Sequence, residues 1–268
     1  MNIMRFIILI VVALNSLIAS ATNQFSELIY DGGVRKGMYS VPLELDSVSF
    51  SKIMRRLPPK YINTALYRNY IGCWKIQNDS LMLDSILIWD NVKGGLALKT
   101  IEIEDIFDKT RTPSGYFANW VSDTLKLVSG NVVKDGSGGW TTRWELEELV
   151  VAENGIIKKR VHKENKLINK GFGETKIMEL LNDLNVGPIT NRIGLEVNYS
   201  AYDSKGNPKD CSVKIRRGSV DESTDARVIK AVKRMVLKHK PLPIYLIDGK
   251  YQSVPYLMPI NPRKQQVE

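Results

Sequence analysis

Apolar and polar residues alternate most clearly near the end of the chain. From residue 193 to residue 201 every second position is apolar, as in a strand with one buried face. Residues 203–208 are rich in Asp, Ser, Gly, Asn and Pro, which favour turns. The alternation resumes from residue 211 to residue 215. The pattern therefore predicts a β-hairpin.

The apolar period changes after this hairpin. One helical face is apolar and comprises Val228, Ile229, Val232, Met235 and Val236. Acidic residues near position 221 and basic residues near position 239 complement the dipole of a helix between them. A last alternating run holds Val254, Tyr256, Met258 and Ile260. We expect this run to return beside the hairpin, which gives a small β-β-α-β domain with the helix on one face of an antiparallel sheet.

Earlier in the chain, residues 61–166 consist of short apolar runs separated by turn signals, which predict a meander of antiparallel strands. This region contains every tryptophan: Trp74, Trp89, Trp120, Trp140 and Trp144. Before it, Asp31-Gly32-Gly33 and Lys36-Gly37 indicate turns, and residues 50–57 predict a brief helix ended by Pro58. After it, the polar segment 163–176 indicates a linker, followed by a short helix over residues 175–184.

The first residues have the pattern of a secretory signal peptide. Arg5 precedes an apolar run over residues 6–14, and Ala19-Ser20-Ala21 supplies small residues for cleavage after Ala21. An uncleaved anchor is the alternative, but the run is shorter than the roughly 20 residues of a spanning helix. No later segment is apolar enough to span a membrane. We therefore expect an exported protein of the periplasm or cell envelope, with no stable transmembrane segment after cleavage.

These patterns predict an α+β protein in four parts. They are a signal peptide (1–21), an antiparallel β-rich domain of unknown function (22–166), a linker with a short helix (167–192) and the β-β-α-β domain (193–268). The hydrophobic fraction of 43% and the charged fraction of 25% are typical of folded domains. A formal net charge of +9 favours anionic partners. Export and the absence of a basic-aromatic motif argue against nucleic acid.

The sequence contains no recognisable catalytic or metal-binding motif. His162 and His239 have no cysteine or carboxylate set at ligand spacing. Cys73 and Cys211 form a disulfide in one interpretation, which export permits, and are small buried side chains in the interpretation that we favour. The glycine-rich segment 135–139 lacks the spacing of a phosphate-binding loop. We expect neither an enzyme nor a metal or cofactor site.

Three motifs occur in the C-terminal domain in the order of its elements. They are the turn Tyr202-Asp203-Ser204-Lys205-Gly206, the helical segment 226–235 and the closing run Met258-Pro259-Ile260-Asn261. In this order and in these motifs, about the last quarter of the chain resembles a TonB C-terminal domain. The Trp-x-Pro signature of that family is replaced here by residues 237–243, and residues 244–250 look like an insertion. The resemblance implies a sheet edge that pairs with an extended segment of an outer-membrane protein of a Gram-negative bacterium.

The β-rich domain carries a second set of motifs, in residues 66–74, 81–83, 105–107 and 117–120. These segments resemble an uncharacterised exported bacterial module with an Arg-Gly-Tyr start, a Leu-Tyr-Leu strand and an Ala-x-Trp-x-x-Gly-x-Leu stretch. Asn69 and Asp123 stand where that module has glycines. The resemblance implies a domain boundary and no particular activity.

Two functions are consistent with these patterns. The first is an accessory protein that binds an envelope or outer-membrane protein through a final edge strand, with Val254, Tyr256, Met258 and Ile260 as candidate contact residues. We do not expect a complete energy transducer. The transducers of that family have an uncleaved membrane anchor and a long proline-rich spacer, and we expect neither in this sequence. The alternative is a carbohydrate-binding or glycan-processing protein whose ligand face comprises Trp74, Trp89, Trp120, Trp140 and Trp144. Tryptophans spaced through a meander more often fill its core.

Overall fold

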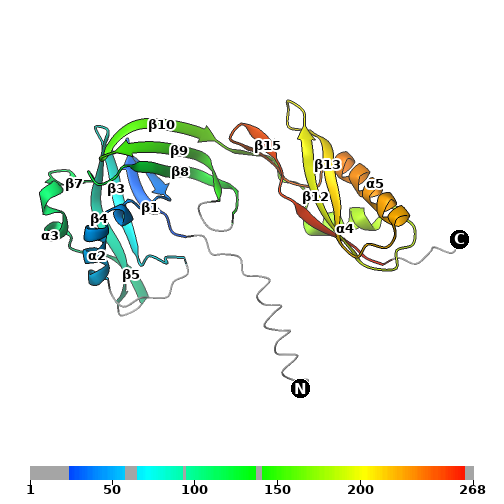
Figure 1. Cartoon of the computed structure of the whole chain (residues 1–268), viewed down its shortest axis with the longest axis horizontal. Helices are drawn as coiled ribbons and strands as arrows, with labels where there is room; N and C mark the ends of the chain where they lie inside the picture. The colour runs from blue at the N-terminus through cyan, green and yellow to red at the C-terminus, as the bar shows by residue number, and fades with distance from the viewer. Residues whose placement is uncertain (1–23, 58–64, 93–94, 137–140, 263–268) are drawn as a thin grey trace, which may run out of the picture. The chain divides into compact units, whose positions relative to one another are not determined.

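The structure is a computed structural model that describes residues 24–57, 65–92, 95–136 and 141–262. It is a strand-rich α+β protein with several sheets, as the sequence predicts (Figure 1). The chain divides into two compact units, Met1–Lys163 (unit 1) and Glu164–Glu268 (unit 2). The predicted signal peptide lies outside the described residues. Within the described ranges, no helix is long and apolar enough to cross a membrane.

Unit 1 is built on one sheet of ten strands. Along the chain these are β1 (Glu27–Asp31), β2 (Val34–Met38), β3 (Tyr70–Gln77), β4 (Ser80–Val92), β5 (Gly95–Thr100), β6 (Arg111–Thr112), β7 (Gly115–Phe117), β8 (Asp123–Lys134), β9 (Arg143–Glu153) and β10 (Ile156–Glu164). Their order in the sheet is β10-β9-β8-β2-β1-β3-β4-β7-β6, and β5 also pairs with β4. The predicted antiparallel meander is only partly correct, because β1 inserts beside β3 and runs parallel to it.

A further pairing, between β10 and β4, closes seven of these strands into a ring. Ile156 pairs with Ser80, and the N–H groups of Leu81 and Ile157 donate to the carbonyl oxygens of Gly155 and Asp79, both at 2.8 Å. Each of the seven strands contributes side chains to one buried core. Ring closure therefore pairs β10, at one end of the sheet, with β4 and reduces the number of open edges.

Strands β1 and β2 are not visible in the hydrophobic pattern, because their inward positions are partly charged. In β1, Glu27, Ile29 and Asp31 lie on one face and are the better buried residues. The turn predicted at Lys36-Gly37 is wrong, since both residues belong to β2 and pair with β1. The preceding turn at Gly32-Gly33 is confirmed, and both glycines have positive φ angles, 58° and 80°.

Short helical segments complete unit 1. They are η2 (Pro42–Leu45), α2 (Ser47–Arg56), α3 (Glu104–Phe107) and η3 (Asp108–Thr110). Helix α2 begins after Asp46, whose carboxylate accepts hydrogen bonds from the amides of Val48 and Ser49. This cap starts the predicted helix three residues earlier than its apolar pattern indicates. Ile53 anchors the helix in the core.

Unit 2 contains two three-stranded sheets. Its elements are β11 (Lys166–Asn169), α4 (Glu174–Asn182), β12 (Ile193–Tyr202), β13 (Pro208–Arg217), α5 (Glu222–His239), β14 (Ile244–Ile247), β15 (Lys250–Gln252) and β16 (Tyr256–Ile260). The β12–β13 hairpin, α5 and β16 lie where the sequence predicts them, and β16 pairs antiparallel with β12. Helix α5 packs against this hairpin and buries Val228, Val232 and Val236 (Figure 1).

The second sheet, β11-β14-β15, is not predicted from the sequence. Strand β11 lies in the segment expected to be a linker, and its residues are mostly exposed, so they show no alternation of buried positions. Strands β14 and β15 form a hairpin within the insertion-like segment. The expected short helix is present as α4, which buries Ile177 and Leu181. Both cysteines are free thiols in the structure, Cys73 half-buried and Cys211 buried.

Candidate functional site

The tryptophans form the alternative ligand face that the sequence predicts. Trp74 is fully buried, and its ring centroid lies 6.5 Å from that of Trp120, which is half-buried and stacks on Phe107 at 5.0 Å. Trp89 and Trp144 are also half-buried, and Trp140 lies outside the described residues. None of the four described tryptophans is exposed, so these four do not line a common exposed surface. The glycan-binding face stays a prediction.

The final edge strand is the main binding surface that the sequence predicts. Tyr256, Met258 and Ile260 lie in β16, whereas Val254 lies in the preceding loop. Met258 and Ile260 are buried in the core of unit 2 and Tyr256 packs against it, so these three side chains face inward. They hold the strand in place, and their side chains do not offer a contact surface to a partner.

Among the described residues, β16 pairs only with β12, so its second edge has no paired strand. Leu257 alternates with the inward residues and is 69% exposed, the most exposed large apolar side chain of unit 2. The alternation of apolar residues does not single out Leu257, because Leu257 occupies the polar position of the pattern. A proline in a strand is tolerated where its nitrogen faces an open edge, and Pro259 is two residues from Leu257. Both residues therefore turn their backbone towards the open edge.

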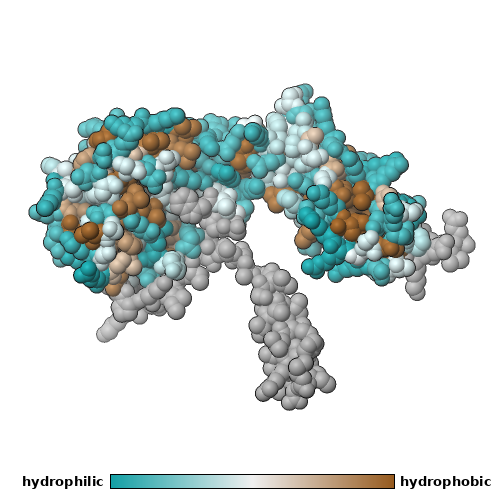
Figure 2. All heavy atoms as spheres, viewed as in Figure 1, coloured by the Kyte–Doolittle hydropathy of each residue, from teal (hydrophilic) through white to brown (hydrophobic). Residues whose placement is uncertain are grey.

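Apolar surface also occurs elsewhere on the visible face of both units, as patches between hydrophilic residues (Figure 2). On unit 1 the exposed apolar side chains include Leu45, Val48, Met54 and Tyr67, which come from η2, α2 and the segment before β3. Two pockets lined by described residues of unit 1 lie next to α2.

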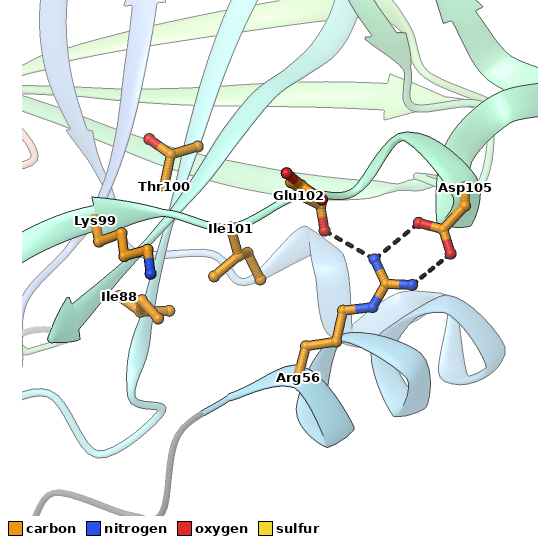
Figure 3. A pocket seen from close by; sticks show the side chains of 7 residues that line it. All are labelled: Arg56, Ile88, Lys99, Thr100, Ile101, Glu102 and Asp105. Atoms are coloured by element: carbon orange, nitrogen blue, oxygen red, sulfur yellow. Dashed lines mark hydrogen bonds and ion pairs between the residues drawn. The ribbon is translucent and has the colours of Figure 1, made fainter.

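The larger pocket, about 660 Å³, lies between the end of α2, β5 and α3 (Figure 3). Arg56 donates to both carboxylate oxygens of Asp105 and, at 2.8 Å, to the backbone carbonyl of Glu102. The Arg56 guanidinium lowers the pKa of Asp105, and the carboxylate in turn raises the pKa of Arg56. These charges satisfy each other, so the pocket presents no unused charged group from this pair.

The smaller pocket, about 350 Å³, is lined by residues of three segments: Glu44, Phe50, Met54, Leu57, Tyr67, Arg68, Asn69 and Tyr70. We call it the Arg68 pocket. Asn69 shapes its polar wall, because its φ of 61° places it in the left-handed region, which asparagine tolerates better than most residues. The Asn69 N–H donates to Leu66 at 3.0 Å and so closes the turn that leads into β3.

Arg68 connects this pocket to the interior of unit 1. Its Nη2 donates to the Phe25 carbonyl at 3.0 Å and lies 3.7 Å from Oε1 of Glu27. The guanidinium lies over the ring of Tyr70, 5.5 Å from its centroid. Among the described residues, none accepts a hydrogen bond from Arg68 Nε and none donates one to Glu27 Oε1. The guanidinium therefore retains unused donor capacity.

Glu27 is fully buried behind Arg68. Its other oxygen, Oε2, accepts a hydrogen bond from Trp74 Nε1 at 2.5 Å. Burial raises the pKa of Glu27 to about 7, although Arg68 and the Trp74 hydrogen bond act in the opposite direction. The sequence does not indicate that Glu27 is buried, because a glutamate in a strand is normally expected to face solvent.

A separate cluster of four charged side chains joins β1, β2, β9 and β10. Lys36 Nζ lies 2.8 Å from Asp31 and 2.7 Å from Glu148, and Arg160 Nη1 lies 2.7 Å and 2.9 Å from the same two carboxylates. Burial raises the pKa of both carboxyl groups, but the hydrogen bonds from Lys36 and Arg160 outweigh it and hold both pKa values below normal. Because each charge is paired, the cluster holds strands together and offers no open ligand site.

No protein-family model, curated protein or solved structure matches this chain. Within the described ranges, no group of three or more His, Cys, Asp and Glu side chains is arranged to hold a metal ion. Among the described residues, the open edge of β16 and the Arg68 pocket are two places where backbone or side-chain groups have unused bonding capacity.

Proposed function

We propose that this protein is an exported accessory protein of the cell envelope that binds an extended segment of another envelope or outer-membrane protein along β16. The observation that supports this proposal is the edge of β16 opposite β12, which no described strand covers. Strand addition at such an edge takes its affinity from backbone hydrogen bonds and its specificity from the alternating side chains.

Two features limit how a partner strand can pair with this edge. Pro259 contributes a carbonyl oxygen but no N–H, so Leu257 supplies the outward donor within β16. The exposed Leu257 side chain adds apolar contact beside that donor. A short edge with few donors resists self-association and favours a partner that matches its register. The resemblance to TonB C-terminal domains agrees with this binding mode.

Site-specific crosslinking of the full mature chain tests the proposal. We expect a photo-reactive amino acid in place of Leu257 to crosslink one envelope protein in bacterial extracts. The same amino acid in place of Leu146, an exposed apolar residue of β9 in unit 1, is the matched control and is expected not to crosslink that protein. Equal crosslinking from both positions would place the contact elsewhere.

The identified partner then permits a measurement of affinity. Leu257→Pro removes the outward donor while leaving the inward hydrogen bonds to β12 intact. The loss of one backbone hydrogen bond, about 1 kcal/mol, corresponds to an affinity reduced about fivefold. An unchanged dissociation constant, with unit 2 still folded, would exclude backbone pairing at this edge.

A further inference from the structure

The Arg68 pocket differs from the pocket beside Arg56 because its guanidinium is not saturated by a bidentate carboxylate. Arg68 makes one hydrogen bond, to a backbone carbonyl, and one longer ion pair with Glu27. Arg56, in contrast, makes three hydrogen bonds to Asp105 and Glu102. Arg68 Nε is buried and Nη2 is already engaged, so the Nη1 donors remain for a second anionic partner, and a planar guanidinium favours a carboxylate.

The apolar wall of the pocket comes from one helix. Phe50, Met54 and Leu57 recur at helical spacing along and just beyond α2 and line the same pocket. At about 30 Å³ for each water-sized group, a volume of about 350 Å³ accommodates about a dozen non-hydrogen atoms. The pocket is thus large enough for one small organic molecule with an apolar body.

A second charged group restricts which anion fits. Glu44 also lines the pocket, is exposed, and accepts a hydrogen bond from the Tyr70 hydroxyl at 3.4 Å. Because the Arg68 guanidinium lies over the same tyrosine ring, Tyr70 has the cation near its face and the carboxylate at its hydroxyl. A phosphate would be repelled by Glu44 and would find a single arginine. A molecule that carries both a carboxylate and an ammonium complements both residues.

We infer that the Arg68 pocket binds an apolar α-amino acid, with the ligand carboxylate on Arg68, its ammonium group at Glu44, and its side chain against Phe50, Met54 and Leu57. Phenylalanine, with a dozen non-hydrogen atoms, has the size of the pocket. The buried Glu27 fixes the position of Arg68 from behind and keeps the guanidinium preorganised. This site lies in unit 1 and does not depend on the proposed role of β16.

Three probes with one apolar body test the inference on the full mature chain by calorimetry. L-phenylalanine carries both charges, 3-phenylpropionate lacks the ammonium and phenethylamine lacks the carboxylate. We expect phenylalanine to bind about tenfold more tightly than either of the other two, as the loss of one charged hydrogen bond requires. No phenylalanine binding at millimolar concentrations, or equal binding of all three probes, would overturn the inference.

Variants assign the two charges. Glu44→Gln, on the surface, is expected to weaken phenylalanine binding about tenfold while leaving 3-phenylpropionate binding equal or stronger. Glu102→Gln makes the same change at the other pocket and is expected to alter neither. Arg68→Lys retains the charge but not the planar fork, and is expected to weaken both carboxylate probes without affecting phenethylamine. If Arg68→Lys does not fold, the Glu44→Gln comparison decides alone, and an equal effect on all probes would contradict the assignment.

Discussion

The two units of the chain differ in the kinds of residue that they bury. Unit 1 buries charged groups, Glu27, Lys126, Glu147 and Glu148, whereas the described part of unit 2 buries polar residues but no charged ones. Buried ion pairs do little for stability by themselves, but they penalise arrangements in which a charge loses its partner. The charges of unit 1 therefore help to specify which strands become neighbours in its ring, and unit 2 relies on local alternation and one amphipathic helix.

The largest test of this contrast is to break the four-residue charge cluster. Glu148→Gln removes one of its two anions and leaves Lys36 and Arg160 sharing Asp31. We expect unit 1 to lose about 3 kcal/mol of stability, because each cation then lacks part of its compensation. Urea unfolding followed by tryptophan emission reports on unit 1, because all five tryptophans lie there, and circular dichroism follows both units.

A pair on the surface of unit 2 provides the matched control. Glu196 pairs with Arg216 through two hydrogen bonds at 2.8 Å and 3.0 Å, and both side chains are accessible to solvent. Glu196→Gln is expected to leave unit 2 nearly unchanged, since exposed pairs contribute little. If the two variants lose equal stability, the burial of charge is not what separates the units.

Glu27 makes the stability of unit 1 depend on pH. The folded protein binds this proton more tightly than the unfolded chain, because burial raises the pKa from 4.5 to about 7. The resulting stabilisation is complete below about pH 4.5 and is lost as pH rises to about 7. Between pH 5 and pH 7 we expect the wild type to lose about 2 kcal/mol relative to Glu27→Gln, which keeps a hydrogen-bond acceptor for Trp74 without titrating.

Unfolding free energies of both proteins across this pH range supply the measurement. The difference between them isolates Glu27 from other titrating groups. A parallel decline of both proteins would show that Glu27 keeps an ordinary pKa. The emission of Trp74, whose ring nitrogen bonds to this carboxylate, is expected to change over the same pH range.

The contrast between the units also explains what the sequence can reveal about the fold. In unit 2, the pattern of residues 193–260 predicts the hairpin, α5 and β16. Each of these elements has a buried face and a solvent-exposed face, and its apolar residues recur with a regular period. In unit 1, β1 reverses the usual rule: Glu27 and Asp31 face inward while Tyr30 is exposed. A prediction based on alternating apolar residues therefore assigns the wrong buried face to such a strand. The pairing of β1 with β3 depends on contacts far apart in the sequence, which no local pattern records.

The candidate sites, like the fold, are only partly visible in the sequence. The sequence predicts the final strand, but the apolar positions of this strand fill the core, and the exposed Leu257 lies at a position where the pattern predicts a polar residue. The Arg68 pocket combines α2 with a turn that contains a positive φ angle at Asn69, and neither feature implies a cavity. Only the helical spacing of Phe50, Met54 and Leu57 is visible in the sequence, and it is equally typical of a face that packs on a core.

Two glycines with similar φ angles, one in each unit, differ in the space around them. Gly155 has a φ of 77°, and a Cβ there would lie 2.6 Å from the Ala118 carbonyl oxygen beside the β4–β10 closure. Gly249 has a φ of 74° in the β14–β15 turn, with nothing within 4 Å. Gly155→Ala is expected to cost about 2 kcal/mol or more, and Gly249→Ala about 1 kcal/mol from backbone strain alone. If both variants lose the same free energy of unfolding in urea, the strands at the ring closure shift enough to accommodate the added methyl group at little cost.

The smallest effect distinguishes the two cysteines by their reactivity. Burial raises the pKa of Cys211 to about 11, and its Sγ lies 3.8 Å from the Lys233 carbonyl oxygen. Burial also raises the pKa of the half-buried Cys73. At pH 8 about one thousandth of the Cys211 thiol is ionised, so we expect iodoacetamide to modify Cys73 first, and both thiols equally in urea. Prior modification of Cys211 would mean that unit 2 opens more readily than unit 1, and that local alternation provides less resistance to opening than the charged interior.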